Sequence, residues 1–136
     1  MATRLAEIGE FGLIERIRRI LEPINRRSTL QSRLQLAIGD DAAVWQPAEG
    51  QSQVITTDAL VEGTHFDLLT TSWQDLGWKS LAVNVSDVGA MGAVPELAVI
   101  TLGLPRQTAV EDIEAFYEGL ADCAGRWGVA IVGGDI

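Results

Sequence analysis

The chain has 136 residues, a length typical of a single domain, and 47% of them are hydrophobic against 21% charged. This balance predicts a folded globular domain and excludes a disordered segment. With 19 acidic and 10 basic residues, the net charge of -9 disfavours nucleic acid and anionic membranes as partners. A phosphate ligand would need cations held by carboxylates to offset that charge locally.

Cysteine content and hydrophobicity predict the compartment. The single cysteine, Cys123, cannot form an internal disulfide, and residues 1–12 lack the apolar run of a secretory signal. No run of about 18 uninterrupted apolar residues is present, as a membrane span would require. We therefore expect a soluble, cytoplasmic protein with no membrane partner.

Three segments have the apolar periodicity of helices. The first covers residues 11–21, and Pro23 is expected to end it. The second covers residues 76–91, follows a capping box formed by Ser72 and Asp75, and is apolar on most of its circumference, which predicts a buried helix. The third follows a capping box formed by Thr108 and Glu111 and ends at a glycine.

Four further segments predict strands, and a polar stretch over residues 25–32 predicts a loop. The predicted strands cover residues 34–38, 54–57, 97–104 and 129–132. The third is too continuously apolar for an exposed strand, so we expect it to be central in its sheet. The order of elements predicts an α+β fold in which helices cover a mixed β-sheet.

Acidic residues follow three of the predicted strands, namely Asp41 with its neighbour Asp40, then Asp58, and finally Asp135. Ligands commonly gather beyond strand ends in open sheets, and neighbouring glycines allow a phosphate to approach the backbone. Magnesium prefers oxygen ligands and is typically held by one or two carboxylates plus substrate phosphates. The pattern indicates Mg²⁺ sites, although each acid alone could instead form a turn or cap a helix.

Asp87 is the most informative acid, because the helix that carries it is predicted to be buried. A buried carboxylate without a partner costs several kcal/mol, so a metal ion is a natural explanation. The alternative is a cap or an ion pair with Lys79 or an arginine. Thr56 and Thr57 could add oxygen ligands beside Asp58, which follows them in the sequence.

Other chemistry is either absent or open to two interpretations. The chain contains neither G-x-x-x-x-G-K-[ST] nor G-x-G-x-x-G, which excludes an ordinary P-loop kinase. His65 and Cys123 cannot form a zinc cluster, and the cysteine is expected in the core. His65 is either a solvated loop residue or a substrate contact. Tyr117 either packs in the core or contacts a nucleotide base.

Eight short motifs, in order along most of the chain, resemble the thiamine-monophosphate kinase family. They are Gly9-Glu10-Phe11, Gly39-Asp40-Asp41-Ala42-Ala43, Thr56-Thr57-Asp58, Gly63-Thr64-His65-Phe66, the run from Lys79 to Asp87, Met91-Gly92-Ala93, Leu102-Gly103-Leu104-Pro105 and Gly133-Gly134-Asp135. The wider superfamily includes aminoimidazole ribonucleotide synthetase, selenophosphate synthetase and a hydrogenase-maturation protein. The Thr-His-Phe and Asn-Val-Ser-Asp segments favour the thiamine enzyme.

The resemblance implies transfer of the ATP γ-phosphoryl group to thiamine monophosphate, giving thiamine diphosphate and ADP. It implies ATP contacts from Tyr117, Gly134 and Asp135, and places His65 by the thiamine phosphate. The resemblance implies no separate catalytic residue, because bound metal ions would position the phosphates. Asp40 would support a metal ligand or have a structural role. The implied Mg²⁺ ligands are Asp41, Thr56, Thr57, Asp58, Asp87 and Asp135.

The resemblance also implies an aminoimidazole ribonucleotide synthetase-like N-terminal domain that forms a homodimer, whose sheet is completed to a barrel by dimerisation. Residues 1–136 would be the ATP- and Mg²⁺-binding domain, and the family's second domain is absent from this chain. Ile136 stands where the family usually has threonine. We expect this domain alone to be inactive. The alternatives are another ATP-dependent enzyme of the superfamily and a non-catalytic dimerisation module.

Overall fold

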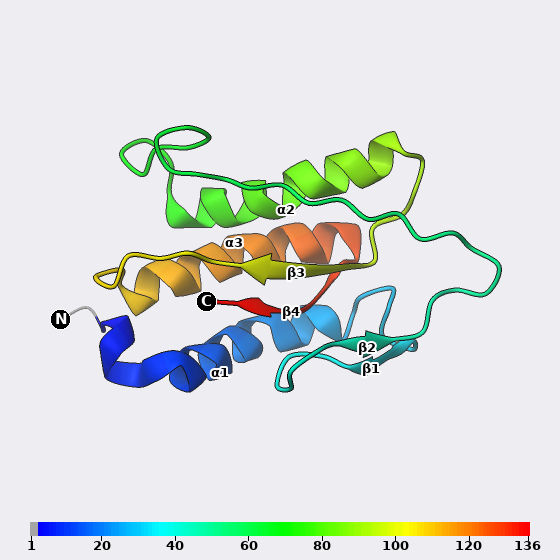
Figure 1. Cartoon of the computed structure of the whole chain (residues 1–136), viewed down its shortest axis with the longest axis horizontal. Coiled ribbons are helices and arrows are strands. Elements are labelled where there is room, and N and C mark those ends of the chain that lie inside the picture. The colour runs from blue at the N-terminus through cyan, green and yellow to red at the C-terminus, as the bar shows by residue number, and fades with distance from the viewer. Residues whose placement is uncertain (1–2) are drawn as a thin grey trace.

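The computed structural model describes the backbone of residues 3–136, which form three helices and four strands (Figure 1). The central helix is α3, which lies between the other two (Figure 1). The helices are α1 (Leu5–Asn25), α2 (Trp73–Ala90) and α3 (Val110–Trp127), and the strands are β1 (Leu34–Leu36), β2 (Val44–Trp45), β3 (Leu97–Thr101) and β4 (Ala130–Asp135). Within residues 3–136, no helix is both long enough and apolar enough to cross a membrane.

The core is built around α3, whose apolar face contacts both other helices. Its end is as predicted, since Gly128 adopts a left-handed conformation with φ 71°. Its start is different. The N-cap is Ala109, so the capping box predicted at Thr108 is wrong. The Glu111 carboxylate instead accepts the backbone N–H of Thr3 at 2.9 and 3.1 Å, which ties the start of the chain to α3.

Two glycines allow α2 and α3 to pack backbone against backbone. A Cβ atom on Gly77 would lie 1.8 Å from the carbonyl oxygen of Phe116. A Cβ atom on Gly119 would lie 1.8 Å from the carbonyl oxygen of Gln74. Real Cβ atoms do not approach backbone oxygens so closely, so a residue with any side chain at either position would push the helices apart.

The start of α2 is as predicted, but its burial is not. The Ser72 hydroxyl accepts the backbone N–H of Asp75 at 3.0 Å, which confirms the N-cap. The prediction of a buried helix is wrong, because α2 buries one face against α3 and leaves Trp78 and Gly89 exposed. The residues buried along it are Leu76, Gly77, Leu81 and Val85.

The first helix is longer than predicted at both ends. It starts at Leu5, has non-helical angles at Gly9 (φ 66°, ψ 175°), and continues two residues past Pro23 to Asn25. Pro23 therefore does not end the helix. A proline removes one helical hydrogen bond, but the last turn is still closed by the Arg26 N–H, which donates to the Glu22 carbonyl at 3.1 Å, and by the Arg27 N–H, which donates to the Ile24 carbonyl at 2.9 Å. The buried face of the helix consists of Leu13, Ile17 and Leu21.

The strands form two separate pairs rather than one mixed sheet. β1 and β2 pair antiparallel, and β3 and β4 pair parallel. Because β3 has β4 as its one partner in the described chain, it is an edge strand and not the predicted central one. Val99 in its middle is 64% exposed. The α+β class is confirmed, and the β-sheet is smaller than predicted.

The segment predicted as a strand over residues 54–57 has no regular structure. A strand needs a neighbour to satisfy its backbone groups, and none of residues 3–136 forms a ladder with this segment. Ile55 is 95% exposed. Figure 1 shows the segment as part of a long connection that loops out past the end of α3 before it returns to α2.

Candidate phosphate and metal site

The end of β4 brings a glycine and an acid to the surface. In the ladder with β3, Gly134 lies opposite Ile100 and Asp135 opposite Thr101. Gly134 has φ 154°, and a Cβ atom there would lie 1.8 Å from the Ile100 carbonyl oxygen, so this position requires glycine. Asp135 belongs to the strand itself, and its carbonyl accepts the Leu102 N–H at 2.9 Å. Its carboxylate is left exposed to solvent.

A second acid lies in the tight turn that follows β1. Gly39 has φ 124°, a conformation that favours glycine. The backbone N–H of Asp41 donates to a carboxylate oxygen of Asp40 at 2.9 Å. Asp40 therefore shapes the turn, and the exposed carboxylate of Asp41 is available for a ligand.

The long connection meets α2 at a single acid. The Thr56 hydroxyl donates to Asp87 Oδ2 at 3.5 Å, a long hydrogen bond. Asp87 is exposed, so the prediction that it is a buried charge needing a metal is wrong. Lys79, its alternative partner, donates from Nζ to the His65 carbonyl oxygen at 2.6 Å instead.

The acids do not form one preformed metal cage. Among residues 3–136, no group of three or more His, Cys, Asp or Glu side chains could hold a metal ion. The structure brings Thr56 to Asp87 but does not assemble Asp41, Asp58 and Asp135 around them. Exposed carboxylates still fit Mg²⁺, which keeps several waters and binds through one or two carboxylates plus phosphates.

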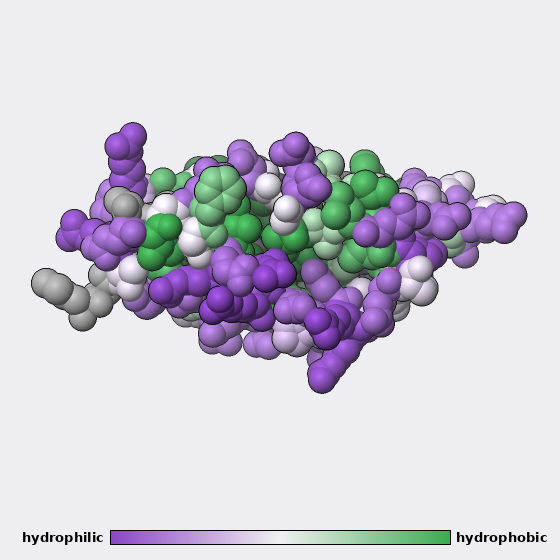
Figure 2. Space-filling view, turned by 90° about the horizontal axis from the view of Figure 1, so that it is seen from below, coloured by the Kyte–Doolittle hydropathy of each residue, from purple (hydrophilic) through white to green (hydrophobic). Residues whose placement is uncertain are grey.

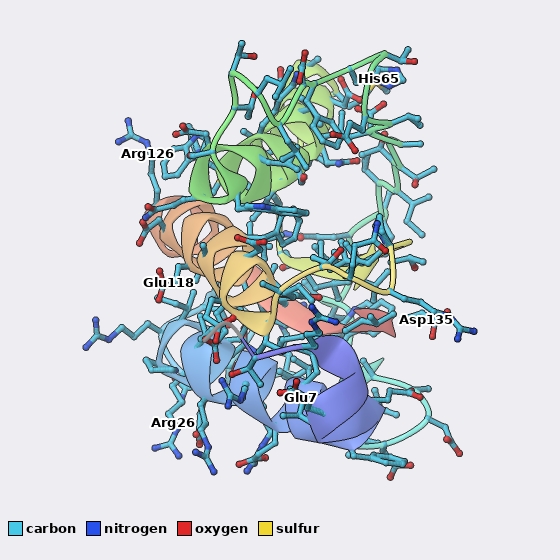
Figure 3. The ribbon with its side chains drawn as sticks, turned by 90° about the vertical axis from the view of Figure 1, so that its left-hand side faces the viewer. Glu7, Arg26, His65, Glu118, Arg126 and Asp135 are labelled. Atoms are coloured by element: carbon cyan, nitrogen blue, oxygen red, sulfur yellow. The ribbon has the colours of Figure 1, made fainter. Side chains whose placement is uncertain are left out.

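His65 is held in a short hydrogen-bonded loop. The ring Nδ1 of His65 accepts the backbone N–H of Val61 at 3.1 Å, and the backbone N–H of His65 donates to the Val61 carbonyl at 2.9 Å. Because Nδ1 accepts, a neutral ring carries its proton on Nε2, where it can donate to an anion. Figure 3 shows His65 and Asp135 on the same side of the molecule, opposite Glu118 and Arg126 of α3.

Tyr117 and Cys123 lie in the core. The Tyr117 side chain is 4% exposed and packs edge-on against Phe116, with ring centroids 5.4 Å apart. Burial raises the pKa of Tyr117 to about 12. Of the two alternatives for this residue, the structure shows core packing, and a contact with a base would require the ring to leave it. Cys123 is fully buried, as predicted.

Two contacts at this site were not predicted from the sequence. The bond from Thr56 spans 31 residues to Asp87, and the bond from Lys79 spans 14 residues to His65. All four residues belong to the motifs noted above, which is the signal that could have paired them. Residue spacing alone could not, because the chain between β2 and α2 contains neither a helix nor a strand.

The structure is that of a small α+β domain with exposed acids and an exposed glycine at the end of β4. Residues 39–136 match the family described as AIR synthase related protein, N-terminal domain. This match covers most of the chain, and the chain belongs to that family.

Individual relatives are named thiamine-monophosphate kinase. The protein from Aquifex aeolicus is 42% identical over 135 residues, which cover 98% of this chain and 39% of the relative. The protein from Bacillus subtilis is 35% identical over 116 residues, which cover 85% of this chain and 36% of the relative. The chain therefore spans less than two fifths of the length of these curated relatives.

Solved structures show the same similarity. Thiamine-monophosphate kinase from Stenotrophomonas maltophilia K279a matches with a TM-score of 0.74 and 40% identity over 93% of this chain and 37% of its own. AaThiL complexed with AMPPCP and TMP matches with a TM-score of 0.58 and 35% identity over all of this chain and 40% of its own. This chain is therefore similar in both sequence and fold to thiamine-monophosphate kinases.

Proposed function

We propose that residues 1–136 are the ATP- and Mg²⁺-binding N-terminal domain of an enzyme that transfers the ATP γ-phosphoryl group to thiamine monophosphate. The observation that carries this proposal is the similarity to AaThiL, whose complex contains AMPPCP and TMP and which matches the whole of this chain. The proposed products are thiamine diphosphate and ADP. A cytoplasmic location and a second domain in the parent protein stay predictions.

Charge is the first problem that such a transfer must solve. Both reactants are anions and the chain carries a net charge of -9. Bound Mg²⁺ would supply charge neutralisation between the phosphates and the carboxylates. The proposed ligands are oxygen atoms of Asp41, Thr56, Thr57, Asp58, Asp87 and Asp135. Their separation in the structure fits ions that are completed by phosphate and water.

The two phosphate groups must also be positioned for the transfer, and we assign this role to the backbone at the end of β4 and to His65. The absence of a side chain at Gly134 lets β4 lie against the Ile100 carbonyl, and the exposed backbone of Gly134 at the end of β4 would contact a phosphate group. The imidazole of His65 is oriented by Val61 and can donate from Nε2 to the phosphate of thiamine monophosphate. Accurate placement of two phosphates supplies much of the rate enhancement in this kind of reaction.

We also propose that two copies of the chain associate through the surface that carries β3 and β4, here called the strand face, and complete a barrel-like sheet. The strand β3 has an open edge, and Val99 on it is 64% exposed. Ile55 is 95% exposed in the segment that was predicted as a strand. Figure 2 shows several hydrophobic areas between hydrophilic ones on the surface seen from below. A second copy could supply the missing ladder partners.

The proposed activity is tested by the variant Asp58→Asn in the parent enzyme. We expect phosphoryl transfer to be nearly abolished with thermal unfolding unchanged, because the exposed carboxylate contributes charge rather than packing. The matched control is Asp122→Asn, an exposed acid on α3, which should retain activity. Normal transfer by Asp58→Asn would contradict the assignment.

The alternatives are separated by calorimetric titration of this chain with Mg²⁺ and a non-hydrolysable ATP analogue. Binding supports the nucleotide domain, whereas a dimer that binds neither supports the non-catalytic dimerisation module. Failure of the parent enzyme to bind thiamine monophosphate, together with binding of another acceptor, would favour a different ATP-dependent enzyme of the superfamily.

A further inference from the structure

The side chain of Asn25 forms two hydrogen bonds with the backbone of one β4 residue. Asn25 Nδ2 donates to the Ile131 carbonyl oxygen at 2.7 Å, and Asn25 Oδ1 accepts the Ile131 N–H at 2.8 Å. The same pair of bonds is exchanged between facing residues of antiparallel strands. Asn25 therefore takes the place of a neighbouring strand at this point of β4.

Local contacts hold Asn25 in position at the end of α1. Its carbonyl oxygen accepts the Ser28 hydroxyl at 2.8 Å and the Ser28 N–H at 3.2 Å. The next residue, Thr29, donates from its N–H and its hydroxyl to the Gly128 carbonyl at 3.1 and 3.2 Å. The turn after α1 is thus bonded to β4 and to the residue that ends α3.

The bonded residue lies directly before an irregularity in β4. Ala98 pairs with Ile131, but the next β3 residue, Val99, pairs with Gly133, so Val132 is an extra residue. Such a bulge bends a strand and re-aims the side chains that follow. Ile131 and Val132 are each 1% exposed and belong to two different core clusters. Core packing therefore holds both Ile131 and Val132 at the bulge, and the hydrogen bonds from Asn25 hold Ile131 as well.

We propose that Asn25 is a positioning residue for the end of β4. By holding Ile131 it fixes the bulge, and the bulge sets the direction in which Gly134 and Asp135 meet a phosphate-bound ion. The ligand part of this inference rests on the proposed function, whereas the geometric part does not. Asp58 and Asp87 lie outside β4, so their contribution should not depend on Asn25.

Two variants of this chain, with one control, separate the loss of the Asn25 hydrogen bonds from a general loss of stability. Asn25→Asp keeps an oxygen for the Ile131 N–H but places a second oxygen against the Ile131 carbonyl, and Asn25→Leu removes both bonds. The control is Leu21→Ala, a fully buried site on the same helix, which lowers stability without a bond to β4. Amide exchange and chemical shifts are measured by NMR, and Mn²⁺ with the ATP analogue serves as the paramagnetic probe of the ion site.

We expect the Ile131 amide to exchange at least about tenfold faster in Asn25→Leu. In both Asn25 variants the amides of residues 133–135 should shift, and the Mn²⁺ affinity measured at Asp135 should fall about tenfold. Line broadening around Asp58 and Asp87 should persist, and Leu21→Ala should leave residues 133–135 unchanged.

Two results would overturn the positioning role: unchanged amides at residues 133–135 in both Asn25 variants, or an equal change in the Leu21→Ala control. If the wild-type chain shows no Mn²⁺ broadening, the proposed function fails by itself. The exchange and shift data then still decide the role of Asn25, since altered residues 133–135 support it and unaltered ones refute it.

Discussion

The pair α2–α3 and the connection before α2 are built in opposite ways. The helices touch through their backbones at Gly77 and Gly119, and they share one continuous core. Residues 51–59 are all exposed and have no regular structure. The one side-chain hydrogen bond that joins this stretch to α2 comes from Thr56. The helical layer is held by its own core packing, whereas one side-chain hydrogen bond joins the acid-bearing connection to α2.

The largest expected effect comes from separating the two helices. Gly119→Ala should lower the free energy of unfolding by about 3 kcal/mol, because the new methyl group meets the Gln74 carbonyl and forces the helices apart. Chemical denaturation measures the effect. Gly89→Ala on α2 is the control, since nothing lies within 4 Å of its Cβ position, and it should raise stability by about 0.5 kcal/mol. Equal midpoints for the two variants would refute the close crossing.

The second largest effect is expected on stability at alkaline pH, where the pKa of Tyr117 reports whether its ring stays buried among the helices. The chain has one tyrosine, so alkaline titration followed by tyrosinate absorbance reports this residue alone. Burial raises its pKa to about 12. The stability that this shift contributes is complete below about pH 10, the pKa of an unfolded tyrosine, and is lost as pH rises through the folded value, roughly 3 kcal/mol in all.

Ionisation of Tyr117 at an ordinary pKa in the folded chain would show that the ring is solvated. That result would favour its alternative role as a nucleotide contact and would weaken the contrast between the two regions.

A smaller effect is expected at the start of α3. The bonds from the Thr3 N–H lower the pKa of Glu111, so its contribution to stability is present above about pH 4.3 and is lost as pH falls through the lower folded pKa. Glu111→Gln should flatten this part of the stability profile. Thermal unfolding across acidic pH measures it, and an unchanged profile would mean that the Thr3 contact does not persist in solution.

The smallest effect on folding is expected in the exposed connection. Ile55→Ser should change the free energy of unfolding of the monomer by less than about 0.5 kcal/mol, because the side chain is 95% exposed. It should nevertheless weaken self-association, measured by sedimentation, if the strand face joins two copies. A large loss of monomer stability would mean that the connection packs against the helical layer after all.

The helices could be predicted from local sequence because their periodicity and caps are local properties. Ser72 caps α2 and Gly128 ends α3 as predicted. Burial could not be predicted in the same way. Asp87 lies on a helix with apolar residues around most of its circumference, but one neighbouring helix covers only one side of it. Exposure depends on how many elements pack around a helix, and sequence period does not report that number.

Strands and the site were less predictable because their partners are distant in sequence. Residues 54–57 have the composition of a strand, yet no described segment pairs with them. The candidate acids were all found from sequence, and the structure shows that they are exposed and not clustered. Asn25 was interpreted as part of a polar loop, although its amide pairs with a strand residue 106 positions away.

By itself the sequence determined the α+β class, the two later helices, the acidic surface and the resemblance to thiamine-monophosphate kinases. Those features depend on composition, local periodicity and short motifs. The tertiary structure decided which side chains are buried, which strands pair, and how β4 presents Gly134 and Asp135. The reason is physical: burial and strand pairing are contacts between distant segments, and a hydrogen bond such as that from Asn25 to Ile131 exists only after both segments have been packed together.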